Sequence, residues 1–193
     1  MLRREGLVSE DAELLAHHAD ADAPLDLICP QRYAEPLAPA IAAERAKKSI
    51  DWESIDRSIR LMSTGHDCMI VEGVGGILVP LDPKHTVIDM ARWLGLPAII
   101  VARPGLGTIN HTLLTLYALK QAGVKVAGVV INGYPAESPG LAEETNPRAI
   151  ERWGKTSVLC LVPKSEVSSL PIISQDIMSA IGTVDWASKL AIS

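Results

Sequence analysis

The sequence predicts an α/β protein whose parallel β-sheet is covered by helices on both faces. Four apolar runs are nearly continuous rather than alternating, which is typical of strands buried on both sides. They are Cys68–Glu72, Ala98–Ala102, Val124–Asn132 and Ser157–Val162. Their starts lie 30, 26 and 33 residues apart, so each interval has room for a helix and two loops. This spacing indicates β-α-β units, in which strands are parallel and crossovers right-handed.

The residues before the first of these runs are predicted to be helix and loop. Ser9 is a suitable N-cap for a helix through Asp11 and Leu15, because its hydroxyl can accept from a free N–H and the acidic residue favours the positive helix end. The Pro-containing stretch Leu25–Pro39 is predicted to be a long ordered loop, and Ala40–Lys48 a second helix. A first strand of the sheet is not evident among the opening 65 residues.

Helices are also predicted between and after the apolar runs. Asp51–Met62 carries apolar residues at helical spacing, and Val87–Leu94 is followed by Gly95, a normal C-terminal signal. Ile109–Ala122 is apolar on most sides and closes at a glycine. The weakly patterned C-terminal region is predicted to hold a helix from Asp176 onwards.

Composition limits the class of protein. The 193 residues are 48% apolar with a mean hydropathy of +0.19, which suits one globular domain over residues 1–193. A net charge of −5 gives no electrostatic reason to expect a nucleic acid or a membrane surface as partner. The three cysteines are far apart and show no Cys-x-x-Cys, so we expect a reducing, cytoplasmic setting. The five histidines show no metal-ligand spacing.

Candidate ligand-binding residues follow the predicted strands, because ligands of open α/β sheets lie at the carboxyl ends of the strands. The first run ends in Glu72 and continues as Gly73-Val74-Gly75-Gly76. A carboxylate beside backbone without Cβ atoms can approach a phosphate or a metal ion. An ordinary tight strand–loop junction is the alternative, and the acid together with three glycines favours the ligand site.

The other strand ends are less specific. Arg103–Asn110 leads from the second run directly into a strong helix, whose free N–H groups could bind an anion or simply be capped. The third run ends in Asn132-Gly133, which can contact a base or ribose but is also ordinary turn chemistry. Pro163-Lys164-Ser165 after the fourth run is uninformative alone.

One apparent phosphate-binding motif is excluded. Gly154-Lys155-Thr156 resembles the end of G-x-x-x-x-G-K-[ST], but the first glycine of that motif would fall on Ala149. The triplet also precedes a predicted strand, whereas a P-loop follows one. It is therefore interpreted as a helix-to-strand turn, and the printed sequence holds no other P-loop motif.

Several of these segments together resemble dethiobiotin synthase. The similarity extends from about Gly6 to Pro163, and its most specific part is the block after the second apolar run. The segments that carry it are Ser9–Ala12, Tyr33–Pro39, Met69–Gly76, Val101–Thr115 and Gly128–Gly133. The resemblance implies a P-loop-NTPase-like doubly wound parallel sheet, and a ligase that converts 7,8-diaminopelargonate, CO2 and ATP to dethiobiotin in biotin biosynthesis. It also implies a Mg²⁺ cofactor and a homodimer.

The resemblance implies a role for each matching residue. Asp11 and Glu72 would hold Mg²⁺, which prefers oxygen ligands. The residues that would line the ATP site besides these two are Gly73, Val74, Gly75, Asn132, Gly133, Pro163, Lys164 and Ser165. The substrate carboxylate would meet Gly107, Thr108 and Asn110, on a helix supplied by the neighbouring subunit. The resemblance also implies that Asn146 lies near the substrate.

The sequence departs from the family pattern in its front part. The family begins with a strand, a P-loop and a second strand carrying a catalytic Lys, all before the Ser-Glu-Asp-Ala motif at Ser9. We therefore assign no catalytic residue in this chain and expect these 193 residues to be inactive alone. The favoured explanation is a truncation upstream of Met1. The alternative is a binding or interaction remnant that does not use ATP and keeps the dimer and the carboxylate pocket.

Overall fold

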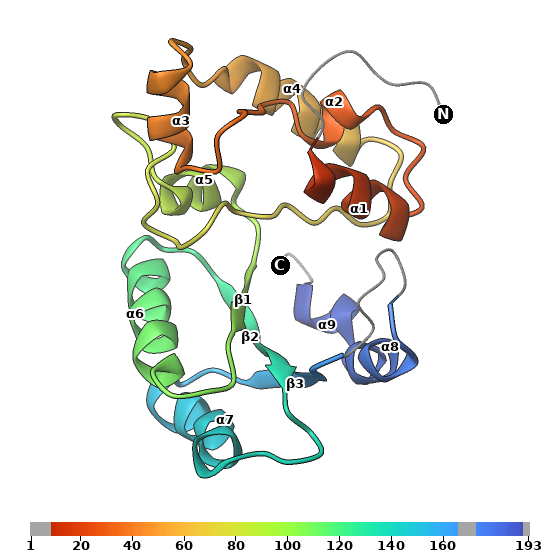
Figure 1. Cartoon of the computed structure of the whole chain (residues 1–193), viewed down its shortest axis with the longest axis vertical. Coiled ribbons are helices and arrows are strands. Elements are labelled where there is room, and N and C mark those ends of the chain that lie inside the picture. The colour runs from red at the N-terminus through yellow and green to blue at the C-terminus, as the bar shows by residue number, and fades with distance from the viewer. Residues whose placement is uncertain (1–8, 166–172, 191–193) are drawn as a thin grey trace. The chain divides into compact units, whose positions relative to one another are not determined.

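The computed structural model describes residues 9–165 and 173–190. Its contacts group the chain into two compact units, Met1–Val87 and Ile88–Ser193, which are described separately (Figure 1). A single domain over residues 1–193 stays a prediction. None of the helices in the described ranges is long and apolar enough to cross a membrane.

The second unit is built on the parallel sheet that the sequence predicts. The strands are β1 (Ala98–Ala102), β2 (Val126–Tyr134) and β3 (Val158–Pro163), and they lie in the order β1-β2-β3. Both pairings are parallel. Three of the four predicted strands are thus confirmed, with bounds that differ by at most two residues, because each is a continuous apolar run that a two-sided sheet buries.

Helices cover both faces of this sheet. The helices of the unit are α5 (Val87–Leu94, which begins at the boundary), α6 (Thr108–Gln121), α7 (Leu141–Gly154), α8 (Gln175–Gly182) and α9 (Trp186–Leu190). Helices α6 and α7 lie on one side of the sheet, and α8 and α9 lie on the other (Figure 1). The predicted turn at Gly154-Lys155-Thr156 is confirmed, since α7 ends there and β3 begins two residues later.

The core of the second unit lies on both faces of β2. Val129 and Ile131 have no exposed surface, and neither does Ile150 of α7. Val130 points to the opposite face, where it packs in a cluster with Cys160, Val162, Ile177 and Trp186. Alternate residues of a strand point to opposite faces, so a strand that is apolar throughout can pack against the helices on both sides of the sheet.

The first unit is helical in the described residues. Its helices are α1 (Glu10–His18), α2 (Leu25–Ile28), α3 (Pro39–Arg45) and α4 (Trp52–Ser63). The predicted N-cap is confirmed, because Ser9 Oγ accepts a hydrogen bond of 3.2 Å from Ala12 N. The predicted loop Leu25–Pro39 is wrong at its start, where one helical turn forms after Pro24, whose carbonyl accepts from Leu27 N at 2.8 Å.

The prediction of a buried strand over Cys68–Glu72 is wrong. These residues have irregular backbone, and Ile70 is 83% exposed. A strand needs a neighbouring strand to satisfy its N–H and C=O groups, and in the described residues the sheet consists of β1, β2 and β3 only. Apolar composition alone therefore does not make this segment a strand.

Candidate functional site

The ends of β2 and β3 bring together most of the residues predicted to recognise the nucleotide base. Asn132 pairs with Val162 and Tyr134 with Pro163 in the parallel ladder. Beyond it, Lys164 N donates a 2.8 Å hydrogen bond to Tyr134 O, which extends the pairing past β3. The Asn132 side chain is exposed, so its amide is free to meet a ligand at this edge. The structure thus places Asn132, Gly133, Pro163 and Lys164 side by side.

Gly133 makes this strand end possible. The register of β2 against β3 shifts between Asn132 and Tyr134, and Gly133 has φ +75° there. Left-handed backbone disfavours residues with a Cβ atom, although the space around Gly133 is open. The glycine is therefore required by its backbone conformation, and the irregular register turns the chain at the ligand-facing edge.

The loop after β1 leads into an anion-binding geometry. Gly107 is the N-cap of α6 in left-handed backbone, with φ +90° and no side-chain cap. In the described residues no backbone carbonyl accepts from the N–H groups of Ile109 and Asn110. Free N–H groups and the positive end of a helix stabilise an anion. Asn110 is exposed beside them.

Thr108 lies at the start of α6, where it was predicted, and its side chain is buried. Its side chain is 3% exposed, and its hydroxyl lies 3.5 Å from the Thr112 hydroxyl one turn along α6. The Thr108 N–H is also occupied, since it donates to Gly105 O at 3.3 Å. Thr108 therefore holds the first helical turn from inside rather than presenting a group at its tip.

The two predicted magnesium ligands lie in the first unit. Asp11 is exposed on the first turn of α1, and Glu72 is exposed before the glycine turn. Neither carboxylate makes a hydrogen bond or ion pair with another described side chain. In the described ranges, no three His, Cys, Asp or Glu side chains are grouped so that they could hold a metal ion by themselves. Mg²⁺ needs only one or two carboxylates when phosphates complete its shell, so the donor set fits this ion.

The glycine turn after Glu72 is compact. A Cβ on Gly73 would lie 2.9 Å from Val87 Cγ1, and one on Gly75 would lie 3.1 Å from Val79 Cγ2. Gly75 also has φ +68°. The turn therefore requires glycine for packing and conformation within its own unit, while Val74 is 51% exposed.

A partly buried carboxylate that sequence reasoning missed lies at Asp82. Its Oδ2 accepts a 2.6 Å hydrogen bond from Trp52 Nε1 of α4, and its Oδ1 accepts from the N–H groups of Lys84 at 2.7 Å and His85 at 2.8 Å. The His85 ring nitrogen Nδ1 lies 2.9 Å from Oδ2. Burial opposes ionisation, but these hydrogen bonds outweigh it and hold the pKa of the Asp82 carboxyl well below its usual range. The Asp82-Pro83 pair is a turn signal and could have predicted the local hydrogen bonds to Lys84 and His85, but not the one from Trp52.

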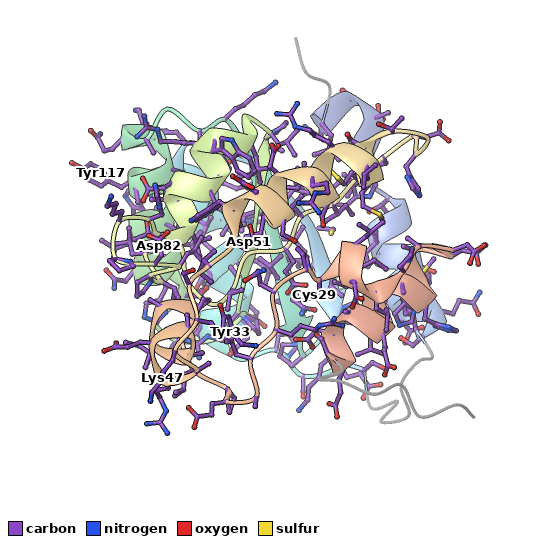
Figure 2. All side chains as sticks on the ribbon, turned by 90° about the horizontal axis from the view of Figure 1, so that it is seen from above. Cys29, Tyr33, Lys47, Asp51, Asp82 and Tyr117 are labelled. Carbon is purple, nitrogen blue, oxygen red and sulfur yellow. The ribbon has the colours of Figure 1, made fainter. Side chains whose placement is uncertain are left out.

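A hollow of about 760 Å³ in the first unit contains none of the predicted site residues. Its wall includes Tyr33, Lys47, Asp51 and Trp52, and Figure 2 labels three of these on separate segments. Burial raises the pKa of the Tyr33 hydroxyl, and its oxygen has no hydrogen-bond partner in the described part of the chain. The lining carries the basic side chains of Arg32, Lys47 and Lys48 and the acidic ones of Asp51 and Glu53, so it mixes both charges.

Comparison with known proteins decides the family. A family model described as an AAA domain matches residues 3–171. The ATP-dependent dethiobiotin synthetase of Bacillus licheniformis is 43% identical over 159 residues, which cover 82% of this chain and 67% of the relative. The chain belongs to the dethiobiotin synthetase family. Its relatives of that name in Anaeromyxobacter sp. strain K and Thermodesulfovibrio yellowstonii are 42% and 38% identical, over 79% and 84% of this chain and 68% and 71% of their own lengths.

The family is one of ATP-dependent enzymes of biotin biosynthesis, and the expected P-loop-NTPase-like α/β class is confirmed. The chain spans about two thirds of the length of these dethiobiotin synthetases. A solved cell-division ATPase MinD of Pyrococcus furiosus is 20% identical with a TM-score of 0.41, over 68% of this chain and 52% of that one. That value is too low to establish a shared fold, so the fold class rests on the family match and on the parallel sheet.

Proposed function

We propose that this chain serves the ATP-dependent closure of 7,8-diaminopelargonate with CO2 to dethiobiotin. The observation that carries the proposal is 43% identity over 82% of the chain to an ATP-dependent dethiobiotin synthetase. One substrate amine adds to CO2 to give a carbamate, and a carbamate oxygen takes the γ-phosphoryl group of ATP with release of ADP. The second amine then attacks the carbonyl carbon, phosphate leaves and the ring closes. We place the reaction in the cytoplasm.

The substrate carboxylate is bound at the start of α6 in this proposal. The N–H groups of Ile109 and Asn110, which have no backbone acceptor among the described residues, supply hydrogen bonds to it. Gly107 allows close approach because it has no Cβ, and the exposed Asn110 amide can contribute directly. Thr108 supports the turn through its buried side chain.

The nucleotide base is recognised at the ends of β2 and β3. The exposed Asn132 amide can exchange two hydrogen bonds with the edge of an adenine, and Gly133 with Pro163–Ser165 forms the surrounding backbone. Asp11 and Glu72 would hold Mg²⁺, which supplies charge neutralisation at the transferred phosphoryl group. The turn Gly73-Val74-Gly75 would line the phosphate side.

These assignments predict how the 193 residues behave by themselves. Calorimetry is expected to show binding of 7,8-diaminopelargonate without added ATP, because the helix terminus that would bind it lies within one unit. No ADP is expected to form with ATP, Mg²⁺, bicarbonate and this substrate, because the printed sequence has no G-x-x-x-x-G-K-[ST] motif. Absence of binding would overturn the carboxylate site. ADP release that depends on the substrate would overturn the predicted inactivity.

The proposed homodimer has a candidate surface on and near α6. Leu106 is 96% exposed, Leu114 is 59% exposed and Tyr117 is 65% exposed. The last two are three residues apart and share a helix face, and Tyr117 points outward in Figure 2. Apolar side chains gathered on one face are typical of interaction sites.

Charges on this face are expected to separate the subunits. We expect Leu114→Glu together with Tyr117→Glu to shift the chain from dimer to monomer in sedimentation velocity, since burying two carboxylates opposes association. The matched control is Thr115→Glu, a half-buried α6 position between them whose hydroxyl donates to His111 O. A wild-type chain that is monomeric, or a double variant that stays dimeric, would contradict the assignment of this face.

A further inference from the structure

The loop that joins β1 to α6 is held by one side chain from another helix. Asn146 lies on α7 and is 5% exposed. Its amide nitrogen Nδ2 donates to Pro104 O at 2.7 Å and to Gly105 O at 3.2 Å. One amide group thus donates to two consecutive carbonyls of the loop.

These carbonyls decide the direction of the loop. Pro104 has no N–H, so its segment offers one donor fewer for fixing the chain locally. Gly105 O also accepts from Thr108 N at 3.3 Å, which begins the first turn of α6. The next residues, Leu106 and Gly107, complete the approach to the helix, the latter in left-handed backbone. Fixing Pro104 O and Gly105 O therefore fixes the start of α6.

The residue type at position 146 is informative for a second reason. Asn is a modest helix former, and it stands directly before Pro147 inside α7. A proline inside a helix removes one backbone hydrogen bond and crowds the preceding turn. An Asn-Pro pair at this buried position therefore weakens α7, and the donation to the loop is what the structure gains from it.

We propose that Asn146 is the positioning residue of the carboxylate site at the start of α6. It acts through the loop: its amide holds the Pro104 and Gly105 carbonyls, and the held loop aims the N–H groups of Ile109 and Asn110 at the substrate carboxylate. The inference rests on the proposed function, since that carboxylate belongs to 7,8-diaminopelargonate. A purely structural role in packing α7 on α6 is the competing explanation.

The decisive variant is Asn146→Asp, which keeps the shape of the side chain and removes the donors. The new carboxylate faces two carbonyl oxygens, so the loop is expected to turn away from it. The Kd for 7,8-diaminopelargonate, measured by calorimetry, is expected to rise at least tenfold. The amide protons of Thr108 and His111, which donate to Gly105 O and Gly107 O, are expected to lose protection from hydrogen exchange.

The matched control is Ile150→Val on the same helix. Ile150 has no exposed surface, so the lost methylene weakens the packing of α7 while the Asn146 donors are kept. We expect this control to lower the unfolding midpoint while leaving both the Kd and the two amide protons unchanged. If Asn146→Asp changes neither readout more than Ile150→Val does, the positioning role is overturned.

The two proposals can fail separately. A wild-type chain that does not bind 7,8-diaminopelargonate would overturn the proposed carboxylate site, and hydrogen exchange would still report whether Asn146 holds the loop. Binding by the wild type with equal Kd in Asn146→Asp would leave the proposed function standing and remove the positioning residue.

Discussion

Replacing Gly128 by valine is expected to lower the free energy of unfolding by about 3 kcal/mol, the upper end of the usual cost of overpacking a core. Gly128 lies in β2, where a Cβ would be 2.5 Å, 2.7 Å and 2.9 Å from three side-chain atoms of Leu159. Leu159 lies in the neighbouring strand β3 and packs against the core cluster of Val130, Cys160 and Val162, so it cannot move aside freely. Urea unfolding followed by circular dichroism measures the loss.

Two further variants isolate the cause of that loss. Gly133→Ala in the same strand is expected to cost only about 1 kcal/mol, because its space is open and only the positive φ opposes a Cβ. Adding Leu159→Ala to Gly128→Val should recover part of the loss, so the two changes should be non-additive by about 1 kcal/mol or more. Equal costs for the two glycines, or strict additivity, would contradict the close-packing explanation.

Asp82→Ala is expected to destabilise the first unit by about 3 kcal/mol, because hydrogen bonds to an ionised acceptor are strong and the abandoned donors are partly buried. The variant leaves Trp52 Nε1 and the N–H groups of Lys84 and His85 without their acceptor. Asp82→Asn retains one carbonyl oxygen and should cost less. A loss below 0.5 kcal/mol in either variant, the size of an ordinary surface change, would contradict this role.

The same carboxylate predicts a pH dependence. Its pKa is lower in the folded state than in the unfolded chain, so its contribution is fully present above the unfolded pKa of about 4. The contribution is lost as the pH falls through the folded value, since protonation removes the stronger acceptor. The stability difference between wild type and Asp82→Asn is therefore expected to shrink when urea unfolding is repeated from pH 6 down to pH 2. A difference that is constant over this range would contradict the prediction.

Local sequence signals predicted a large part of the fold. Ser9 caps α1, Gly154 ends α7, and the bounds of β1 and α5 coincide with those predicted. These features depend on residues that are close in the chain, such as a hydroxyl three residues from a free N–H. That Asn132 and Pro163 lie close together could also be predicted from the sequence, because the ends of parallel strands meet at one edge of a sheet.

The segment Cys68–Glu72 shows the limit of such signals. Its apolar residues are typical of a buried strand, yet Ile70 is exposed and the backbone is irregular. A helix satisfies its own backbone, whereas a strand depends on a partner that is distant in sequence. The apolar pattern therefore reports that a segment is suited to a sheet and cannot report whether a partner strand is beside it.

The contacts most informative about function and stability join residues far apart in sequence. Asn146 reaches the Pro104 carbonyl across 42 positions, and Trp52 reaches Asp82 across 30. Nothing in the sequence around Asn146 or Trp52 indicates that its side chain donates a hydrogen bond to such a distant residue.

The sequence by itself thus determined the class of the fold, three of its strands and the family of enzymes to which the chain belongs. Only the tertiary structure decided that Thr108 is buried, that Cys68–Glu72 is not a strand and that Asn146 holds the loop before α6. The physical reason is that capping, turns and apolar periodicity are local properties of the chain. Burial and the choice of hydrogen-bond partner depend on which distant segments the fold brings together.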